Sequence, residues 1–280
     1  YYLTGIPSDY TLMFEPAWDN GSRVHTNSWG SNAAGAYTSG SMQADSSART
    51  YQNMTILFSA GNNGVDGNSD GEIDDDSLGS PATGKNVVTV AAGENDRPSI
   101  TSEWGGWWPI QYPSDPVNSD RMANNSEGLA AFSSRGPADD GRLKPDITAP
   151  GSFILSTKSR STSSTGWGAY SGNANYTFMG GTSMSCPLTA GAAALLTQHL
   201  IDNEGHSNPN SSLVKAIFTA SARDMQGQYG SAANGAGEPA PNMHEGWGLV
   251  DLRSAVNATW IDGDSVQTNE ERGWSFIIPP

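Results

Sequence analysis

The sequence contains a single cysteine, Cys186, among its 280 residues. No intrachain disulfide can form, so stability has to come from core packing or from a bound metal. Basic residues are also few, because 14 Lys and Arg stand against 29 Asp and Glu, for a net charge of −15. Such a charge argues against nucleic acid or an anionic membrane surface as a partner.

Long apolar runs are absent as well. No stretch approaches the roughly 18 apolar residues that a membrane-spanning helix needs. The first residues, Tyr1–Gly5, carry neither the basic start nor the apolar core of a secretory signal. We therefore predict no membrane-spanning segment, and we interpret the N-terminus as a cut within a longer protein.

Glycine is abundant, with 33 residues, while only 15% of residues are charged. This composition indicates tight turns and long loops rather than an all-helical body. Runs rich in β-branched residues predict buried strands, and the segments between and after them predict helices. The predicted strands are 55–61, 86–93 and 153–156, and the predicted helices are 34–52, 182–201, 211–222 and 250–256. Their alternation favours an α/β fold with a mostly parallel sheet, helices on both faces, and functional loops at the carboxyl ends of the strands.

The character of the sequence changes from about Asn257. Residues 257–280 resemble strands and turns rather than helix, and they are too few to close a core of their own. We therefore interpret residues 1–256 as one domain and residues 257–280 as the start of a β-rich C-terminal domain.

A serine with the surroundings of a nucleophile lies in the run Gly180-Gly181-Thr182-Ser183. A serine hydroxyl is a poor nucleophile at neutral pH, so it needs a base to take its proton and donors to hold the oxyanion that its attack creates. Ser183 follows a Gly-Gly turn at the predicted start of a helix, where a free backbone N–H and the helix dipole favour negative charge. The same run is also typical of a helix start with a capping Thr or Ser. A nucleophile elbow, Gly-x-Ser-x-Gly, does not fit, because position 185 is serine.

A family resemblance favours the nucleophile. The run Gly181-Thr182-Ser183-Met184-Ser185-Cys186-Pro187, followed by Ala190-Gly191, resembles the nucleophile motif of subtilases, the subtilisin-like serine proteases. Three further segments resemble that family in the expected order, namely residues 27–30, 59–64 and 132–151. Together the matching segments lie between residues 24 and 250.

The resemblance implies roles for individual residues. Asn62 matches the asparagine whose side-chain N–H holds the oxyanion together with the backbone N–H of Ser183. The segment Ser28-Trp29-Gly30 is similar to the strand that binds an extended substrate backbone, and Ala60 and Gly61 match the walls of the substrate pocket. The family implies a secreted or cell-surface serine endopeptidase that hydrolyses extended polypeptides through an acyl-enzyme on Ser183, without a catalytic cofactor.

Two parts of the family pattern are missing. Subtilases carry their catalytic aspartate in an Asp-Ser/Thr-Gly strand end and their histidine in a His-Gly-Thr-His helix start, both upstream of the segments found here. Neither motif occurs, and none of the four histidines, His25, His199, His206 and His244, has the expected neighbours. We interpret residues 1–256 as the C-terminal part of a catalytic domain that is inactive alone. The alternative is a non-catalytic, calcium-stabilised, peptide-binding pseudoprotease.

An acidic segment, residues 66–76, follows the Asn62 loop and places oxygen-bearing side chains at every second position around a glycine. This spacing is typical of calcium-binding loops. The predicted ligands of a structural calcium ion are Asp66, Asn68, Asp70, Asp74 and, through its carbonyl, Glu72. Position twelve of such a loop is Ser77, so Asp75 or Asp76 would have to supply the last carboxylate. The alternative is a solvated acidic loop.

Three tryptophans, Trp104, Trp107 and Trp108, gather within residues 102–109. Such a cluster is typical either of an aromatic platform for a substrate or glycan, or of a loop that packs onto its own domain. We favour the packing loop.

Overall fold

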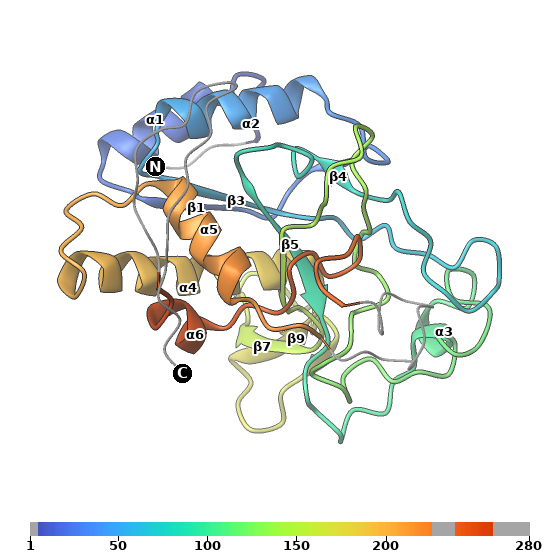
Figure 1. Ribbon diagram of the computed structural model, residues 1–280. Helices are drawn as coiled ribbons and strands as arrows, with labels where there is room; N and C mark the ends of the chain where they lie inside the picture. Colours follow the sequence, from blue (N-terminus) through green and yellow to red (C-terminus); the bar gives the residue numbers. More distant parts are fainter. Residues whose placement is uncertain (1–4, 226–238, 260–280) are drawn as a thin grey trace, which may run out of the picture.

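A four-stranded parallel sheet with the order β1-β3-β5-β6 forms the centre of the computed structural model, which describes residues 5–225 and 239–259 (Figure 1). Its strands are β1 (Val24–Asn27), β3 (Thr55–Ser59), β5 (Val88–Gly93) and β6 (Ile147–Pro150). Each neighbouring pair is parallel. Because parallel strands return through crossovers, their carboxyl ends meet at one edge of the sheet.

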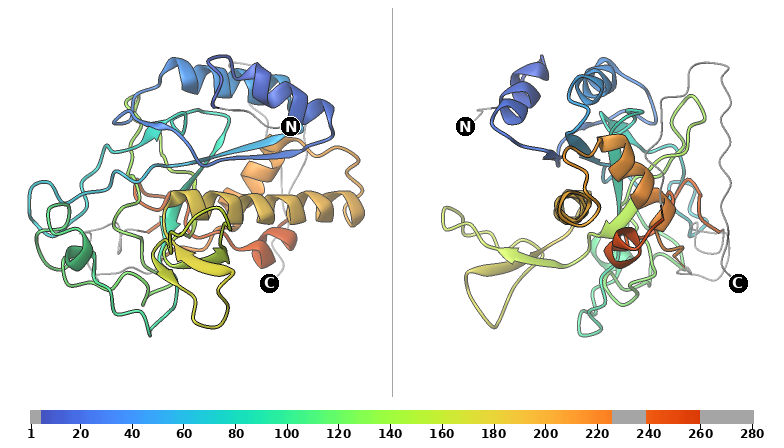
Figure 2. Two further views of the ribbon diagram at one scale, coloured as in Figure 1. Left: turned by 180° about the vertical axis from the view of Figure 1, so that it is seen from behind. Right: turned by 60° about the vertical axis from the view of Figure 1, so that its left-hand side comes forward.

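Helices cover both faces of this sheet, as the sequence predicts. One face carries α4 (Thr182–Asp202), α5 (Ser211–Ser221) and α6 (Leu252–Val256), and the other carries α1 (Thr11–Asp19) and α2 (Ser39–Thr50). Side chains of a strand alternate between faces. Leu57 of β3 accordingly packs with α4 and α5, whereas Ile56 and Phe58 pack with α1 and α2. In the left view of Figure 2, α1 and α2 lie above β1 and β3, and α4 runs below them.

Helix α4 contacts all four strands of the parallel sheet. Its residues Ala190 and Ala193 are small enough for the helix to approach the strands closely, and Leu196 and Leu200 fill the core beyond them. The predicted helix 182–201 is therefore confirmed nearly to the residue, and its first turn lies at the carboxyl ends of β1 and β3.

The predicted helix 34–52 is wrong at its start. Ala34 and Gly35 have φ values of 42° and 76°, which no helix accommodates. Helix α2 begins only at Ser39, after Thr38 accepts the backbone N–H of Gly40 as an N-cap.

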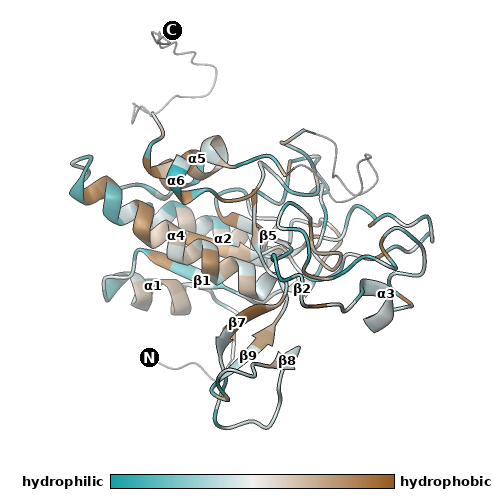
Figure 3. Ribbon diagram, turned by 90° about the horizontal axis from the view of Figure 1, so that it is seen from below, coloured by the Kyte–Doolittle hydropathy of each residue, from teal (hydrophilic) through white to brown (hydrophobic). Residues whose placement is uncertain are grey.

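The predicted buried strand 153–156 also needs correction. Strand β7 (Ile154–Thr157) is half-exposed and pairs antiparallel with β9 (Tyr176–Met179), which in turn pairs with β8 (Gly168–Ala169). The chain turns at Phe153, with φ 47°, so the strand leaves the parallel sheet, and the small sheet extends from the body in Figure 3. The fourth parallel strand is β6, which begins seven residues before β7.

The remaining elements are short. Strands β2 (Ser31–Asn32) and β4 (Gly79–Ser80) form an antiparallel pair, and α3 (Trp104–Trp107) is a single turn. Helix α6 ends at Val256, where the predicted C-terminal domain begins, and residues 260–280 of that domain lie outside the described residues. In the described part of the chain, no helix is long and apolar enough to cross a membrane.

Candidate active site

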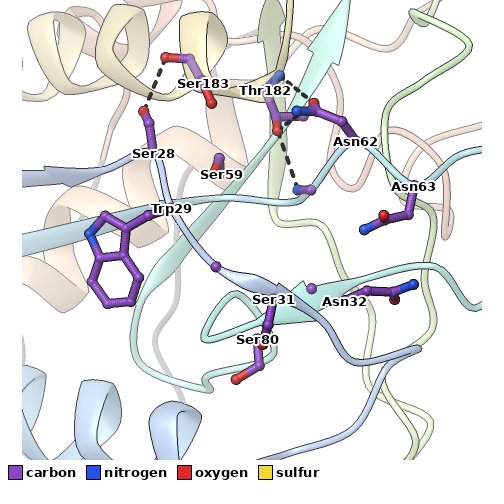
Figure 4. Close-up of a pocket in the computed structure, with 13 residues that line it drawn as sticks. Ser28, Trp29, Ser31, Asn32, Ser59, Asn62, Asn63, Ser80, Thr182 and Ser183 are labelled. Atoms are coloured by element: carbon purple, nitrogen blue, oxygen red, sulfur yellow. Dashed lines mark hydrogen bonds between the residues drawn. The ribbon is translucent and has the colours of Figure 1, made fainter. Parts of the chain in front are cut away.

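A cleft of about 310 Å³ opens at the carboxyl ends of β1 and β3, against the first turn of α4 (Figure 4). Polar side chains and glycines dominate its lining. The lining residues are Ser28, Trp29, Gly30, Ser31, Asn32, Ser59, Gly61, Asn62, Asn63, Gly79, Ser80, Thr182 and Ser183. Six of the seven catalytic and substrate-binding residues predicted from the sequence therefore meet in one cleft.

The seventh, Ala60, does not reach the cleft. Its side chain is fully buried. Its backbone N–H donates to Val90 (2.9 Å), and its carbonyl accepts the N–H of Gly79 (2.9 Å). Ala60 thus holds the Asn62 loop against the sheet rather than lining the cleft itself.

The side chain of Asn62 has a fixed orientation. Its Oδ1 accepts the backbone N–H of Thr182 (2.8 Å) and the Thr182 hydroxyl (2.9 Å), and that hydroxyl accepts the N–H of Gly61 (3.3 Å). With the oxygen engaged in this way, the amide nitrogen of Asn62 is left for the cleft. An amide N–H in this position can donate to a carbonyl oxygen on which negative charge develops.

Ser183 is the second residue of α4 and is half-buried. Its backbone N–H belongs to the first helical turn, whose amides lack acceptors within the helix. The preceding Gly181 has φ 143°, a conformation that glycine adopts without strain, and it brings the chain sharply into the helix. The N–H of Ser183, the side-chain amide of Asn62 and the positive end of the helix therefore face the same cleft.

A proline in α4 explains why Ser28 is hydrogen-bonded to the carbonyl of Ser183. Pro187 has no N–H, so the carbonyl of Ser183, four residues earlier, lacks its helical donor. The hydroxyl of Ser28 donates to that carbonyl instead, at 3.0 Å. This hydrogen bond connects the predicted substrate-binding segment to the start of α4, as Figure 4 shows.

No described residue is hydrogen-bonded to the hydroxyl of Ser183, and the histidines have other surroundings. His25 packs edge-on against Phe14, with ring centroids 4.8 Å apart, and burial lowers its pKa. His199 lies 3.4 Å from Glu204, and His244 lies 3.7 Å from Asp75. Ser183 and Asn62 thus line one cleft, and among the described residues no histidine is hydrogen-bonded to the Ser183 hydroxyl.

Cys186, close to Ser183 in the sequence, lies in the core. It is fully buried one turn after Ser183, its sulfur lies 3.4 Å from the hydroxyl of Thr26, and burial raises the pKa of the thiol. A thiol kept protonated in the core is unreactive.

The acidic loop is closed by its own backbone. Asp66 is buried, and its two carboxylate oxygens accept the N–H groups of Asp70 (3.0 Å) and Gly71 (3.1 Å). The side chains of Asn68, Asp70 and Asp74 likewise accept backbone N–H groups of the loop. The oxygen donors suit calcium, yet across residues 5–225 and 239–259 no three Asp, Glu, His or Cys side chains are grouped to hold a metal ion. The calcium site stays a prediction.

Sequence reasoning missed two contributions to this cleft. It treated Thr182 only as a possible helix cap, although Thr182 is the residue that orients Asn62. It also missed Gly79 and Ser80, which pair with Asn32 and Ser31 and form the opposite wall. A two-residue bridge between distant segments leaves no periodic signal in a sequence. The role of Thr182 had a signal, because Thr182 directly precedes Ser183.

The fold and the cleft together define an α/β protein whose polar cleft, with a serine at a helix start and an asparagine amide facing it, lies at the carboxyl edge of a parallel sheet. The chain belongs to the subtilase family, whose family model matches residues 7–248. This match confirms the resemblance on which the sequence interpretation depends.

Individual relatives agree with this assignment. The serine protease/ABC transporter B family protein tagB of Dictyostelium discoideum is 27% identical over 315 residues, which cover 89% of this chain and 16% of the relative. The PII-type proteinase of Lactococcus lactis subsp. cremoris is 30% identical over 203 residues, covering 66% of this chain and 10% of the relative. The chain thus spans about a sixth or less of the length of these two relatives.

Solved structures share the fold. Fervidolysin from Fervidobacterium pennivorans, a keratinolytic enzyme related to subtilisin, superposes with a TM-score of 0.54 at 24% identity and covers 90% of this chain and 29% of its own. The prenylagaramide maturation protease PagA superposes with a TM-score of 0.55 at 19% identity, covering 92% of this chain and 70% of its own. The predicted α/β fold is confirmed.

Proposed function

We propose that this chain carries the nucleophile and the oxyanion-binding groups of a subtilisin-like serine endopeptidase. The observation that supports the proposal best is the fixed amide of Asn62, whose oxygen is held by Thr182 while its nitrogen is left for the cleft beside Ser183. An amide donor already oriented before substrate binds needs no reorganisation during the reaction.

In the proposed reaction, the hydroxyl oxygen of Ser183 attacks the carbonyl carbon of a peptide bond. The carbonyl oxygen becomes an oxyanion that accepts hydrogen bonds from the Asn62 amide and the N–H of Ser183. The C–N bond then breaks, and the proton taken from Ser183 goes to the departing amine. Water attacks the resulting ester and regenerates Ser183. The substrate is an extended polypeptide whose acyl part lies along Ser28, Trp29 and Gly30.

The general base and its orienting carboxylate are proposed to come from a segment outside this chain. Strand β1 pairs with β3 on one side, and no strand of the described residues pairs with its other side. Beside it, α4 exposes Leu188, Leu195 and Ile201 by 46%, 54% and 43%, and brown patches mark α4 in Figure 3. An unpaired strand edge and an apolar helix face together favour cover by further polypeptide.

Labelling with a fluorophosphonate tests this proposal, because the reagent phosphonylates serines that a base activates. In the full-length protein that contains this chain, we expect one label on Ser183 and none in the Ser183→Ala variant. Residues 1–280 alone should remain unlabelled, since none of the described histidines is hydrogen-bonded to the Ser183 hydroxyl. A well-folded full-length protein whose Ser183 takes no label would refute the enzyme and favour the peptide-binding pseudoprotease.

We further propose that calcium binds the acidic loop of residues 66–76. Among the described residues, the ion pairs leave Asp66, Asp70 and Asp74 without a Lys or Arg partner, so a cation would relieve their mutual repulsion. The loop would then be ordered next to Asn62. A secreted or cell-surface location, which the family favours, is compatible with millimolar calcium.

A further inference from the structure

A second hollow, of about 300 Å³, lies next to the active-site cleft and shares Asn62 with it. Its wall is formed by four aromatic side chains, Trp108, Tyr112, Phe132 and Trp167, and it ends at Gly180 and Gly181, just before Ser183. We call it the aromatic pocket. Of the three tryptophans clustered in the sequence at 102–109, Trp108 lines this pocket.

The aromatic wall is held rigidly. The rings of Trp104 and Trp108 stack with centroids 6.0 Å apart, and Trp167 contacts Trp108 at 5.7 Å and Phe132 at 5.9 Å. Trp167 also lies directly on Gly180, since a Cβ placed there would be 2.0 Å from the indole ring. Interlocked rings of this kind form a preformed surface that loses little entropy when it binds an apolar group.

The lining of the aromatic pocket is uncharged. In a chain with a net charge of −15, the aromatic pocket has no Asp, Glu, Lys or Arg in its lining. The hydroxyl of Tyr112 is satisfied by the carbonyl of Gly64 at 3.2 Å, which leaves Gln111 as the polar side chain besides Asn62. A volume of about 300 Å³ can take one large apolar side chain.

We propose that the aromatic pocket binds a side chain on the leaving-group side of the scissile bond and selects large apolar or aromatic residues there. This inference rests on the proposed endopeptidase function. The carbonyl oxygen of the scissile bond is held at Asn62, and the acyl part of the substrate lies on the side of Ser28 and Trp29. In Figure 4, Asn62 lies across Thr182 from those two residues, so the amine part leaves toward the aromatic pocket.

Partitioning of the acyl-enzyme between water and added amines isolates this pocket from the acyl side. The full-length protein is given one fixed peptide ester together with the amide of glycine, leucine, phenylalanine, tryptophan or aspartate. The amine nitrogen attacks the acyl carbon on Ser183, the carbon–Oγ bond breaks, and one amine proton passes through the base to Ser183. The products are a new peptide amide and the free serine hydroxyl, and their ratio to hydrolysed ester reports binding of the amine.

The wild-type protein should favour phenylalanine and tryptophan amides over glycine amide by at least about tenfold, as burial of one large apolar side chain allows. Aspartate amide should be no better than glycine amide. The Trp108→Ala and Trp167→Ala variants should lose most of this preference while still hydrolysing the ester. The matched control is Trp107→Ala. The ring of Trp107 packs against those of Trp108 and Trp167, with centroids 5.6 Å apart in each pair, but Trp107 does not line the pocket.

A charge change gives a test that spares the ring packing. Gln111 is exposed, and Gln111→Glu should raise the use of arginine amide relative to leucine amide severalfold. Ester hydrolysis with the same partition ratio for all amines would overturn the aromatic pocket alone. If no acyl-enzyme forms on Ser183, the proposed function is wrong, and this inference is wrong with it.

Discussion

The side-chain oxygen of Asn62 accepts two hydrogen bonds from Thr182, one from the backbone N–H and one from the hydroxyl. A backbone N–H can only donate, so the oxygen of this amide has to face Thr182 and the nitrogen has to face the cleft. The orientation of the Asn62 amide therefore depends on Thr182. In the proposed reaction, this makes Thr182 a positioning residue for the oxyanion donor.

Replacement of Thr182 by valine should lower kcat about tenfold and change KM little. Valine keeps the shape of the side chain and the backbone N–H but removes the hydroxyl. The side-chain oxygen of Asn62 therefore loses one of the two hydrogen bonds that orient it. Thr182→Ser should restore most of the activity, because serine supplies the same hydroxyl. Steady-state kinetics of the full-length protein on a peptide substrate measures both, and equal loss in the serine variant would contradict the orienting role.

A double-mutant cycle sharpens the assignment. Asn62→Ala should lower kcat by roughly 10²–10³, the loss known for the oxyanion-hole asparagine of subtilisin. Adding Thr182→Val to that variant should cost nothing more, since no amide remains to orient. Additive losses would mean that Thr182 acts on catalysis by another route.

The contact between Ser28 and Ser183 supports a second prediction. Ser28→Ala should lower the free energy of unfolding by up to about 1 kcal/mol, because it leaves the carbonyl of Ser183 without a donor. Pro187→Ala restores the missing helical N–H, so in that background Ser28→Ala should have almost no effect. Urea denaturation of the four proteins measures this, and an unchanged cost in the Pro187→Ala background would rule the explanation out.

The parallel sheet and its helices were predictable because their signals are local. Buried strands such as Val88–Gly93 are runs of apolar residues, and the small residues of α4 identify a closely packed helix. The start of α2 was not predictable, since the positive φ values at Ala34 and Gly35 depend on the loop packed around them: a Cβ at Gly35 would lie 2.7 Å from the carboxylate of Asp76. The strand predicted over 153–156 was expected to be buried among the parallel strands, but β7 pairs with β9 instead, because tertiary contacts decide the partner of a strand.

The candidate site also contains residues that the sequence predicts and residues that it does not. Ser183 and Asn62 lie in runs whose family resemblance specifies a role, so both could be named before their separation in space was known. The wall formed by Gly79 and Ser80 and the approach of Trp167 to Gly180 could not, because they join segments far apart in the chain. The family resemblance assigned Ala60 to the wall of the substrate pocket, but the alternation of side chains along the chain turns it inward.

Removal of calcium should lower the Tm of the protein. A ligand present at about 100 times its Kd stabilises by about 2.7 kcal/mol, which corresponds to roughly 5–10 °C for a chain of this size. Asp70→Asn keeps an acceptor for the N–H of Glu72 but removes a charge, so it should abolish most of the shift on chelation. Asp96→Asn, at an exposed position outside the loop, is the control. If EGTA leaves the melting of the wild type unchanged, the acidic loop is simply solvated.

Stability should depend on pH through His244. Burial, assisted by the charge of Arg135, lowers the pKa of His244 to about 4 in the folded protein from an ordinary 6.5. The unfolded chain therefore takes up a proton between pH 6.5 and 4 that the folded chain refuses. The contribution is fully present above about pH 6.5 and is lost as the pH falls to about 4, to an extent of about 3 kcal/mol at most.

Glu245 acts in the opposite direction over nearly the same range. Burial raises the pKa of its carboxyl to about 7, so its contribution is present at low pH and is lost as the pH rises from about 4.5 to 7. In the wild type, the pH dependences that His244 and Glu245 give to the free energy of unfolding partly cancel. The measurement is therefore the difference between wild type and His244→Gln in denaturant titrations at several pH values, and it should grow as the pH rises from 4 to 6.5. A constant difference would show that His244 does not titrate across the unfolding transition.

The apolar face of α4 allows a test of the proposal that other polypeptide covers it. Leu195 is 54% exposed in this chain, so Leu195→Lys should change the stability of residues 1–280 by no more than about 0.5 kcal/mol. In the full-length protein the same lysine would be forced under a covering segment, and the cost should reach about 2 kcal/mol or more. Ile110→Lys, at a position 87% exposed and away from β1, controls for the general effect of added charge and should be neutral in both proteins. Equal, small effects of Leu195→Lys in the two proteins would mean that α4 stays uncovered. The base for Ser183 would then have to reach the cleft without packing against the sheet edge at β1.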